Sequence, residues 1–354
     1  MMADLFPEPA PHRRRLRYRG SHPRRFEEKY KEHQPERYGA VVEKVLASGK
    51  TPAGSHRPIM VEEVIRVLAP CPGEIAVDAT LGFGGHAREI LKRLQPGGRL
   101  LGLDVDAVEL AKTQARLQSS GFGPDTFTAH RSNFAGLPQV LAADGLAGVA
   151  IILADLGVSS MQLDDPRRGF SLKLEGPLDM RMNVERGQPA SALVEKSDAP
   201  ALSALLKENA EEPFAQLLAQ ALHGRRFTTT TSLTAAVRSA LPPMSEENRE
   251  LSVRRVFQAL RIAVNDEFSA LETFLRNLPF CLAPGGRVSI LTFHSGEDRR
   301  VKKAFTTGLR EGRYAEIAQE VIRPTAAERY ANPRSSVAKL RWARVGKVDA
   351  ERTE

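Results

Sequence analysis

Cysteine and long apolar runs are the two features that this sequence most clearly lacks. The 354 residues include only two cysteines, Cys71 and Cys281, which lie far apart and outside any metal-ligand spacing. Two isolated cysteines exclude a disulfide framework and favour a reducing compartment. No apolar stretch reaches the roughly 20 residues of a membrane span, and no apolar core of a secretory signal lies near the N-terminus. We therefore expect a cytoplasmic protein that does not associate with a membrane.

Acidic residues are absent from the segment 11–25, which contains seven arginines. The whole chain has a net charge of +8, so this segment carries most of the surplus. Because aliphatic residues are scarce there, we expect residues 1–55 to form a basic, largely disordered arm with a short helix at 37–47. Such an arm, with Tyr18 and Phe26, is typical of segments that follow nucleic-acid phosphates. A solubility tail and an organellar presequence are the alternatives. The arginines are Arg13, Arg14, Arg15, Arg17, Arg19, Arg24 and Arg25.

Strands and helices are expected to alternate between residues 74 and 158. An apolar pattern at helical spacing precedes them at 61–68. Alternation at this spacing is typical of βαβ units, in which helices cover both faces of a parallel sheet. The expected fold class is therefore α/β, with an open, mostly parallel, Rossmann-like sheet. The strand candidates are 74–79, 99–104, 126–130 and 149–153, and the helices between them are 85–94, 106–118 and 134–143.

The alternation stops after the fourth strand. Residues 163–251 show only helical patterns, which are joined by polar loops, so we expect an α-helical insertion domain that binds the substrate. A domain of residues 56–162 and 252–345 would then surround it. The insertion helices are expected at 199–209, 213–222 and 232–239. Beyond it we expect a helix at 252–282, a turn at 284–286, a strand at 287–293, a helix from Ser295, and strands at 316–322 and 337–345.

Three of the expected strand ends carry side chains suited to a nucleotide-like ligand. The first strand ends at Asp78, the second at Asp104, and the fourth at Asp155. In open α/β sheets, ligands bind beyond the carboxyl ends of the strands. The first strand leads into a glycine-rich turn, where missing side chains permit a tight bend and a close approach of the ligand. The turn contains Gly82, Gly84 and Gly85 and is followed by His86.

The aspartates decide between two classes of cofactor. The turn also matches a loose dinucleotide fingerprint, Gly82-x-Gly84-x-x-Ala87. A dinucleotide, however, brings a diphosphate that requires N–H donors, whereas Asp78, Asp104, Asp106 and Asp155 would surround this site. Carboxylates suit S-adenosylmethionine, whose sulfonium is positively charged. The residues therefore favour a methyltransferase over an NAD(P)-dependent oxidoreductase, which stays the alternative.

Three of these assignments have a structural alternative. Asp106 precedes a helix and can serve as its cap. His86 falls in the first turn of a helix, where a purely structural role is as well supported as cofactor contact. Phe134 follows the third strand, where its ring can stack on a purine or simply pack between helix and sheet.

One long motif is highly specific. The run Asp155-Leu-Gly-Val-Ser-Ser-Met-Gln-Leu-Asp-Asp-Pro-Arg-Arg-Gly-Phe170, with Gly176-Pro-Leu-Asp-Met-Arg-Met-Asn183, closely resembles the MraW/RsmH family. Four further segments follow in the family's order: 82–86, 257–265, 284–295 and 332–336. The resemblance covers residues 56–345. It implies a bacterial methyltransferase that modifies the exocyclic N4 amine of a cytosine in the decoding region of small-subunit (16S) ribosomal RNA.

The resemblance also implies roles for individual residues. Asp104 would bind the ribose of S-adenosylmethionine, Phe134 would contact the adenine, and Asp155 with Gln162 would lie near the methionine end. Gly84, Gly85 and His86 would contact the cofactor from the turn. The chain departs from the family pattern at Asn209-Ala210, Ala263 and Gly296. The first and third of these fall in segments that could face the substrate and so bear on the target nucleotide. The basic arm resembles an addition to the family core.

The chemistry of an amine acceptor points to Asp155. The amine must lie in line with the methyl–sulfur bond and lose a proton, so Asp155, or a carbonyl of the loop after it, is expected to accept a hydrogen bond from it. Methylation of carbon 5 would instead require a thiolate, and neither cysteine lies near the expected site. The target base must also be unstacked to reach the pocket.

Basic and aromatic residues beyond Asp155 are the expected RNA contacts. They are Arg167, Arg168, Phe170, Arg181, Arg225 and Arg226, while the cluster Arg299, Arg300, Lys302 and Lys303 is more typical of a solvated helix face. The expected partner is small-subunit ribosomal RNA, within an assembled or late-assembly subunit. The sequence leaves a homodimer open, and a non-catalytic RNA-binding assembly factor on the same fold is a further alternative.

Overall fold

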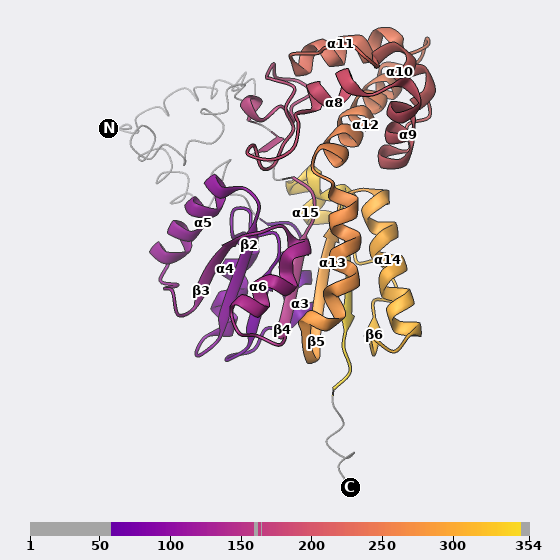
Figure 1. Ribbon diagram of the computed structural model, residues 1–354. Coiled ribbons are helices and arrows are strands. Elements are labelled where there is room, and N and C mark those ends of the chain that lie inside the picture. The colour runs from indigo at the N-terminus through magenta and orange to yellow at the C-terminus, as the bar shows by residue number, and fades with distance from the viewer. Residues whose placement is uncertain (1–57, 159–161, 164, 348–354) are drawn as a thin grey trace, which may run out of the picture. The chain divides into compact units, whose positions relative to one another are not determined.

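The structure, a computed structural model, describes residues 58–158, 162–163 and 165–347 (Figure 1). The predicted basic arm, its helix at 37–47 and its arginines lie outside the described residues. No helix in the described ranges is long and apolar enough to cross a membrane.

Seven strands form one sheet in the order β3-β2-β1-β4-β5-β7-β6 (Figure 1). The first five are parallel, and β7 runs antiparallel to both of its neighbours. This arrangement confirms the predicted open, mostly parallel α/β sheet. The strands are β1 (Ile75–Asp78), β2 (Arg99–Asp104), β3 (Phe127–Arg131), β4 (Val149–Asp155), β5 (Leu282–Thr292), β6 (Glu316–Ile317) and β7 (Lys339–Arg344).

Both faces of the sheet are buried, because neighbouring residues of a strand point to opposite faces. Ala76 of β1 packs with one set of helices and Val77 with the other. One face is covered by α3 (Val61–Leu68), α4 (Gly85–Leu94) and α5 (Ala107–Ser119). The other face is covered by α6 (Leu137–Ala143), α13 (Glu267–Cys281) and α14 (Ser295–Arg310). The site described below lies at the carboxyl edge between these layers.

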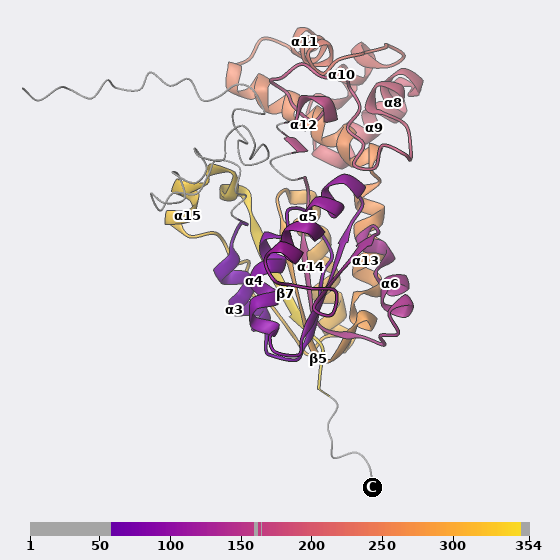
Figure 2. The ribbon, with the colours of Figure 1, turned by 90° about the vertical axis from the view of Figure 1, so that its left-hand side faces the viewer.

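The insertion after β4 has a hydrophobic core of its own, and Figure 2 shows its helices grouped together. Leu206, Leu218, Leu233 and Phe257 are buried in it. The core is built by α8 (Ala190–Lys196), α9 (Ala199–Ala210), α10 (Ala215–Leu222), α11 (Thr230–Ala240) and α12 (Glu246–Val264). Because α12 contributes its buried face to this core, we propose that the helical insertion extends to Asn265.

The single helix expected at 252–282 is two helices in the structure, α12 and α13. The break falls at Asp266, whose φ of 51° is left-handed. Aspartate tolerates this conformation better than most residues. The side chain of Asn265 next to it accepts a hydrogen bond from the Met182 backbone N–H and donates to the Met180 carbonyl. A contact with a segment 83 residues away thus stabilises the break.

Two strands also differ from the prediction. The turn expected at 284–286 lies inside β5, where Gly285 has a φ of 75° and the register with β4 shifts. The bulge lets β5 begin at Leu282 and still pair with β4. The strand expected at 316–322 is reduced to β6, with one isolated bridge between Ile322 and Leu340. The remaining described elements are α15 (Ala326–Ala331) and the short 3-10 helices η2 (Phe134–Gly136), η3 (Pro166–Arg168) and η4 (Pro333–Val337).

Candidate functional site

The sheet brings the three predicted strand-end aspartates to one edge. Asp78 pairs with Gly102 on one side and with Leu153 on the other. Asp104 and Asp155 therefore extend two residues beyond Asp78 on the two neighbouring strands. The glycine turn and the start of α4 follow Asp78 directly. The predicted juxtaposition of carboxylates and turn is thus present in the fold.

Asp104 fixes the glycine turn from the neighbouring strand. One carboxylate oxygen accepts a hydrogen bond from the Gly82 N–H at 2.9 Å, and the other accepts from the Asp106 N–H at 2.9 Å. Thr113 on α5 donates to the Gly82 carbonyl at 2.6 Å. Asp106 caps α5 by accepting hydrogen bonds from the backbone N–H groups of Val108 and Glu109. The structure therefore confirms the alternative in which Asp106 serves as a helix cap.

Gly84 requires its missing side chain. Its φ is 76°, and a Cβ atom there would lie 2.6 Å from the Thr113 methyl carbon. The Arg116 guanidinium covers the Phe83 ring at 3.6 Å on the same side of the turn. The turn is therefore packed against α5, which leaves no room for a side chain at Gly84.

We expect Gly84→Ala to lower the affinity for S-adenosylmethionine about 10-fold or more, because the strained left-handed backbone and the Thr113 contact displace the turn. Isothermal titration calorimetry measures the loss. Gly145→Ala is the matched control, since Gly145 has a φ of 67° and no atom of the described residues lies within 4 Å of its added Cβ. Equal losses in the two variants would contradict a specific role of the turn.

Asp155 is held at its backbone and left open at its side chain. Its N–H donates to Thr80 Oγ1 at 2.6 Å. Its Oδ1 is buried without a hydrogen-bond partner in the part of the chain that the structure describes. Its Oδ2 lies 3.7 Å from Nδ1 of His86, whose Nε2 lies 2.9 Å from the Ile59 carbonyl. An unpartnered buried carboxylate oxygen is costly unless a ligand satisfies it.

The electrostatics of this edge favour a positively charged ligand. Burial, with the charges of Asp78 and Glu297, raises the pKa of Asp155 to about 8. Burial also raises the pKa of Asp78 to about 7 and raises that of Asp104. A cation would stabilise the ionised forms of all three groups. The positively charged sulfonium and amino groups of S-adenosylmethionine suit these three carboxylates, whereas a negatively charged diphosphate does not.

Glu297 and His294 belong to the same site, although the sequence analysis assigned no role to either residue. Glu297 on α14 accepts hydrogen bonds from the backbone N–H groups of Phe293 and His294, at 2.8 and 3.3 Å. Burial alone would raise the pKa of Glu297, but hydrogen bonding and charge from His294, with the charge of Arg261, lower it. The His294 ring lies 3.0 Å from Glu297. A glutamate three residues after a helix-capping residue is a recognisable sequence pattern, and this pattern could have identified Glu297 as part of the start of α14.

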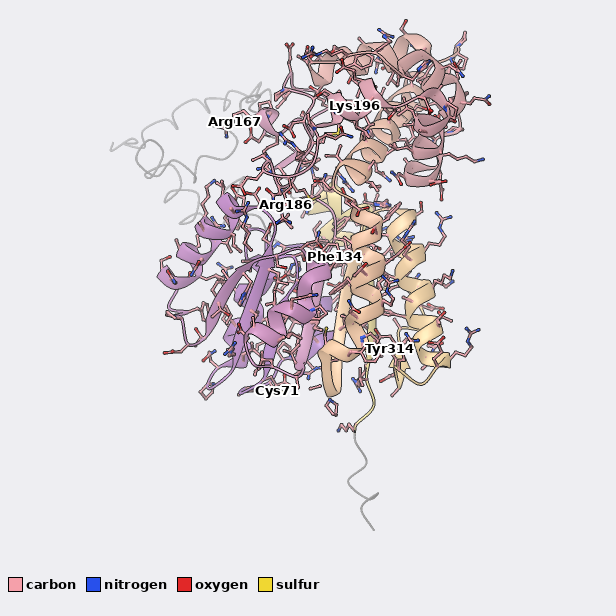
Figure 3. The ribbon with its side chains drawn as sticks, in the orientation of Figure 1. Cys71, Phe134, Arg167, Arg186, Lys196 and Tyr314 are labelled. Carbon is pink, nitrogen blue, oxygen red and sulfur yellow. The ribbon has the colours of Figure 1, made fainter. Side chains whose placement is uncertain are left out.

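Phe134 and Gln162 stay predictions as cofactor contacts. Phe134 begins η2, and its partly buried ring packs edge-on against Phe274 of α13 at 5.4 Å. Figure 3 shows Phe134 at the same end of the sheet as the site, with Cys71 at the opposite end. Burial raises the pKa of Cys281 to about 11. Neither Cys71 nor Cys281 is therefore suited to act as a catalytic thiolate.

The predicted RNA contacts fall into three groups: arginines held by other residues of the chain, a buried phenylalanine, and exposed arginines. Arg168 forms an ion pair with Asp106 at 2.8 Å and donates a hydrogen bond to the Met182 carbonyl at 3.0 Å, and Arg181 forms a two-point ion pair with Asp179. Phe170 is buried in the core of the insertion, where its ring has a packing role, and its contact with RNA stays a prediction. Arg167, Arg225 and Arg226 are exposed.

One departure from the family pattern has a direct explanation. A Cβ at Gly296 would lie 2.7 Å from the Phe268 ring, and Arg300 covers that ring at 3.6 Å. The ring fills the space that a larger residue would need. Asn209 bonds to the Ala259 carbonyl within the insertion. Nothing in the structure explains Ala263.

The chain resembles several ribosomal RNA small subunit methyltransferases H. It is 47% identical to protein 1 of that name from Lachnoclostridium phytofermentans, over 94% of this chain and 93% of the relative. It is 48% identical to protein 2 from Alkaliphilus metalliredigens, over 93% and 97%. It is 45% identical to protein 1 from Agathobacter rectalis, over 94% and 97%.

The model of the MraW methylase family matches residues 53–345. The alignments to the relatives above are longer than this match and must extend into the first 52 residues. Part of the arm at residues 1–55 therefore aligns with these relatives. Because the family model covers most of the chain and the relatives are 45–48% identical along nearly all of it, this chain belongs to the MraW methylase family.

Proposed function

We propose that this protein transfers a methyl group from S-adenosylmethionine to the exocyclic N4 amine of a cytosine in small-subunit ribosomal RNA. The observation that carries the proposal is the buried Oδ1 of Asp155, which has no hydrogen-bond partner among the described residues. It lies near the buried carboxylates of Asp78 and Glu297 at the edge of a methyltransferase-family sheet. The names of the relatives support ribosomal RNA of the small subunit as the substrate class.

The chain's own residues suit the binding of the methyl donor. When bound, S-adenosylmethionine supplies a methyl group on a positively charged sulfur. The Gly82–His86 turn would accept the cofactor closely, since among the described residues a Cβ at Gly82 would have only one atom within 4 Å. The carboxylates of Asp78 and Asp155 would lie on the charged side of the cofactor, and Asp104 would accept from its ribose.

Asp155 is the residue that we propose to act on the acceptor. Its Oδ1 can accept a hydrogen bond from the amine, which orients the nitrogen lone pair and removes a proton as the new bond forms. The nitrogen needs such help because its lone pair is delocalised into the ring. Exposed Arg167, Arg225 and Arg226, with the basic arm, would bind the RNA phosphates.

The decisive experiment uses unmodified small subunits and naked small-subunit RNA with methyl-labelled S-adenosylmethionine. We expect the label on a cytosine N4 after nucleoside digestion and mass spectrometry. Label on a ring carbon would contradict the proposal. Transfer of no label, together with binding of NAD(P) or of RNA alone, would favour an oxidoreductase or a non-catalytic assembly factor.

Cofactor binding should depend on pH. The pKa values of about 7 and 8 mean that at neutral pH Asp78 is about half protonated and Asp155 is mostly protonated, and both must release their protons to bind a cation. Affinity for S-adenosylmethionine should therefore rise from pH 6 to pH 9, by up to about 10-fold per pH unit and per proton released. S-adenosylhomocysteine lacks the sulfonium charge and should show a shallower rise. Calorimetry with both ligands measures this, and equal slopes would contradict recognition of the sulfonium by these carboxylates.

A further inference from the structure

His86 is buried at the start of α4 and faces two oxygen atoms. Its side chain is 6% exposed. Nε2 lies 2.9 Å from the Ile59 carbonyl, which can only accept a hydrogen bond, so Nε2 must carry the hydrogen. In the neutral ring, Nδ1 is then a lone-pair acceptor. That atom lies 3.7 Å from Oδ2 of Asp155.

From this geometry we propose that His86 is the second proton acceptor of the methyl-transfer reaction, taking from Asp155 the proton that the acceptor amine loses. The inference rests on the proposed function, in which Asp155 receives that proton first. The inference assigns the side chain of His86 the role of a proton acceptor, in addition to its predicted contact with the cofactor.

The surroundings of Asp155 explain why a second acceptor is useful. Asp78 faces it from β1, Glu297 from α14 and His86 from α4, so His86 is the nitrogen base among these titratable neighbours. Two neighbouring carboxylates make a negative charge on Asp155 unfavourable and would keep the proton on it. An imidazolium at His86 would place a positive charge beside these groups and return Asp155 to its basic form.

The proton transfer requires no further reactant. The N–H bond of the amine breaks, its electron pair stays on nitrogen, and the proton binds Oδ1 of Asp155. A half-turn of the carboxyl group then brings the protonated oxygen toward Nδ1 of His86. The O–H bond breaks there, its electron pair stays on the carboxylate, and the ring becomes an imidazolium. The present 3.7 Å separation must shorten to hydrogen-bond length, as catalytic contacts often do when ligands bind.

Single-turnover methylation between pH 6 and 9.5, at saturating S-adenosylmethionine, tests the role of His86. We expect His86→Gln to slow transfer about 10- to 100-fold and to remove one ionisation from the pH profile. Its affinity for S-adenosylmethionine should change less than about 3-fold, because glutamine can still donate to the Ile59 carbonyl. A wild-type rate at every pH, or a loss confined to cofactor affinity, would overturn the proposal.

His130→Gln is the matched control. His130 is a partly buried histidine on β3 that lies 3.3 Å from Thr128 and 3.6 Å from the Asp144 carboxylate. It therefore has the same type of neighbours as His86, away from the Asp155 carboxylate. We expect the rate and pH profile of this variant to match those of the wild type. A loss equal to that of His86→Gln would mean that any buried histidine supports the rate, which contradicts the proposal.

Nitrogen-15 NMR of the histidine rings provides a readout that needs no turnover. In the wild-type protein without ligands, we expect His86 to be the neutral Nε2–H tautomer with an unprotonated Nδ1. Observation of the Nδ1–H tautomer would overturn the inference even if the variant cannot fold. Absence of cytosine methylation by the wild type would instead refute the proposed function, so the two failures are distinguishable.

Discussion

Asp155→Asn should slow methyl transfer about 10²- to 10⁴-fold, and it should make the folded protein more heat-stable at pH 8. The loss of rate follows from removing the base that accepts the amine proton, which is typically worth this factor. Asparagine keeps the shape of the side chain and the backbone hydrogen bond to Thr80. Binding of the cofactor should weaken as well, because one negative charge beside the sulfonium is lost.

The gain in stability follows from the raised pKa. Asp155 titrates near its ordinary value of 3.8 in the unfolded chain and at about 8 in the folded protein. Between these values the unfolded state releases the proton and the folded state retains it, so the stability of the wild type falls as pH rises through this window. Asparagine does not titrate. The free energy of unfolding of Asp155→Asn should therefore exceed that of the wild type by a few kcal/mol near pH 8. Each unit of pKa difference between the folded and unfolded states corresponds to about 1.4 kcal/mol.

Scanning calorimetry from pH 5 to pH 9 measures this effect. The melting temperature of Asp155→Asn minus that of the wild type should grow with pH and reach several degrees. Asp144→Asn is the control with the opposite sign, because Asp144 forms an ion pair with Arg99 that the variant loses. An Asp155→Asn protein that is less stable than the wild type at pH 8, or that retains its rate, would contradict the assignment of a functional buried base.

The strand-end aspartates could be predicted because their positions depend on local patterns. Once β1, β2 and β4 are recognised as buried parallel strands, their carboxyl ends must meet at one edge. The sequence alone could not predict that Glu297 approaches Asp155. The electrostatic effect of Glu297 on Asp155 depends on β5 pairing with β4 across the more than a hundred residues that separate the two strands in the chain. It also depends on the capping geometry at the start of α14.

Exposure of charged residues was the least predictable property. Arg167 and Arg168 are adjacent in sequence and have the same charge, so both were expected to contact RNA. The turn after Asp165 directs them differently. The side chain of Arg167 is 82% exposed and that of Arg168 is 20% exposed. The tertiary contacts of Arg168, with Asp106 62 residues earlier in the chain and with the Met182 carbonyl, distinguish the two arginines.

Arg168→Gln should therefore destabilise the protein, by about 2–3 kcal/mol, because it leaves Asp106 buried without its ion-pair partner. Asp106 is 3% exposed and also caps α5, which packs on the glycine turn, so cofactor affinity should fall with stability. Thermal unfolding and cofactor titration measure both losses.

Arg167→Gln is the matched substitution one residue away, and it should behave in the opposite manner. Its ion pair with Asp165 is exposed and contributes little to stability, so the melting temperature should change by less than about 2 °C. If Arg167 binds an RNA phosphate, RNA affinity should fall and the slope of its logarithm against the logarithm of salt concentration should decrease by about one. A salt slope that changes in Arg168→Gln and not in Arg167→Gln would reverse the assignment, because the inward-facing arginine would then be the one that reaches the RNA.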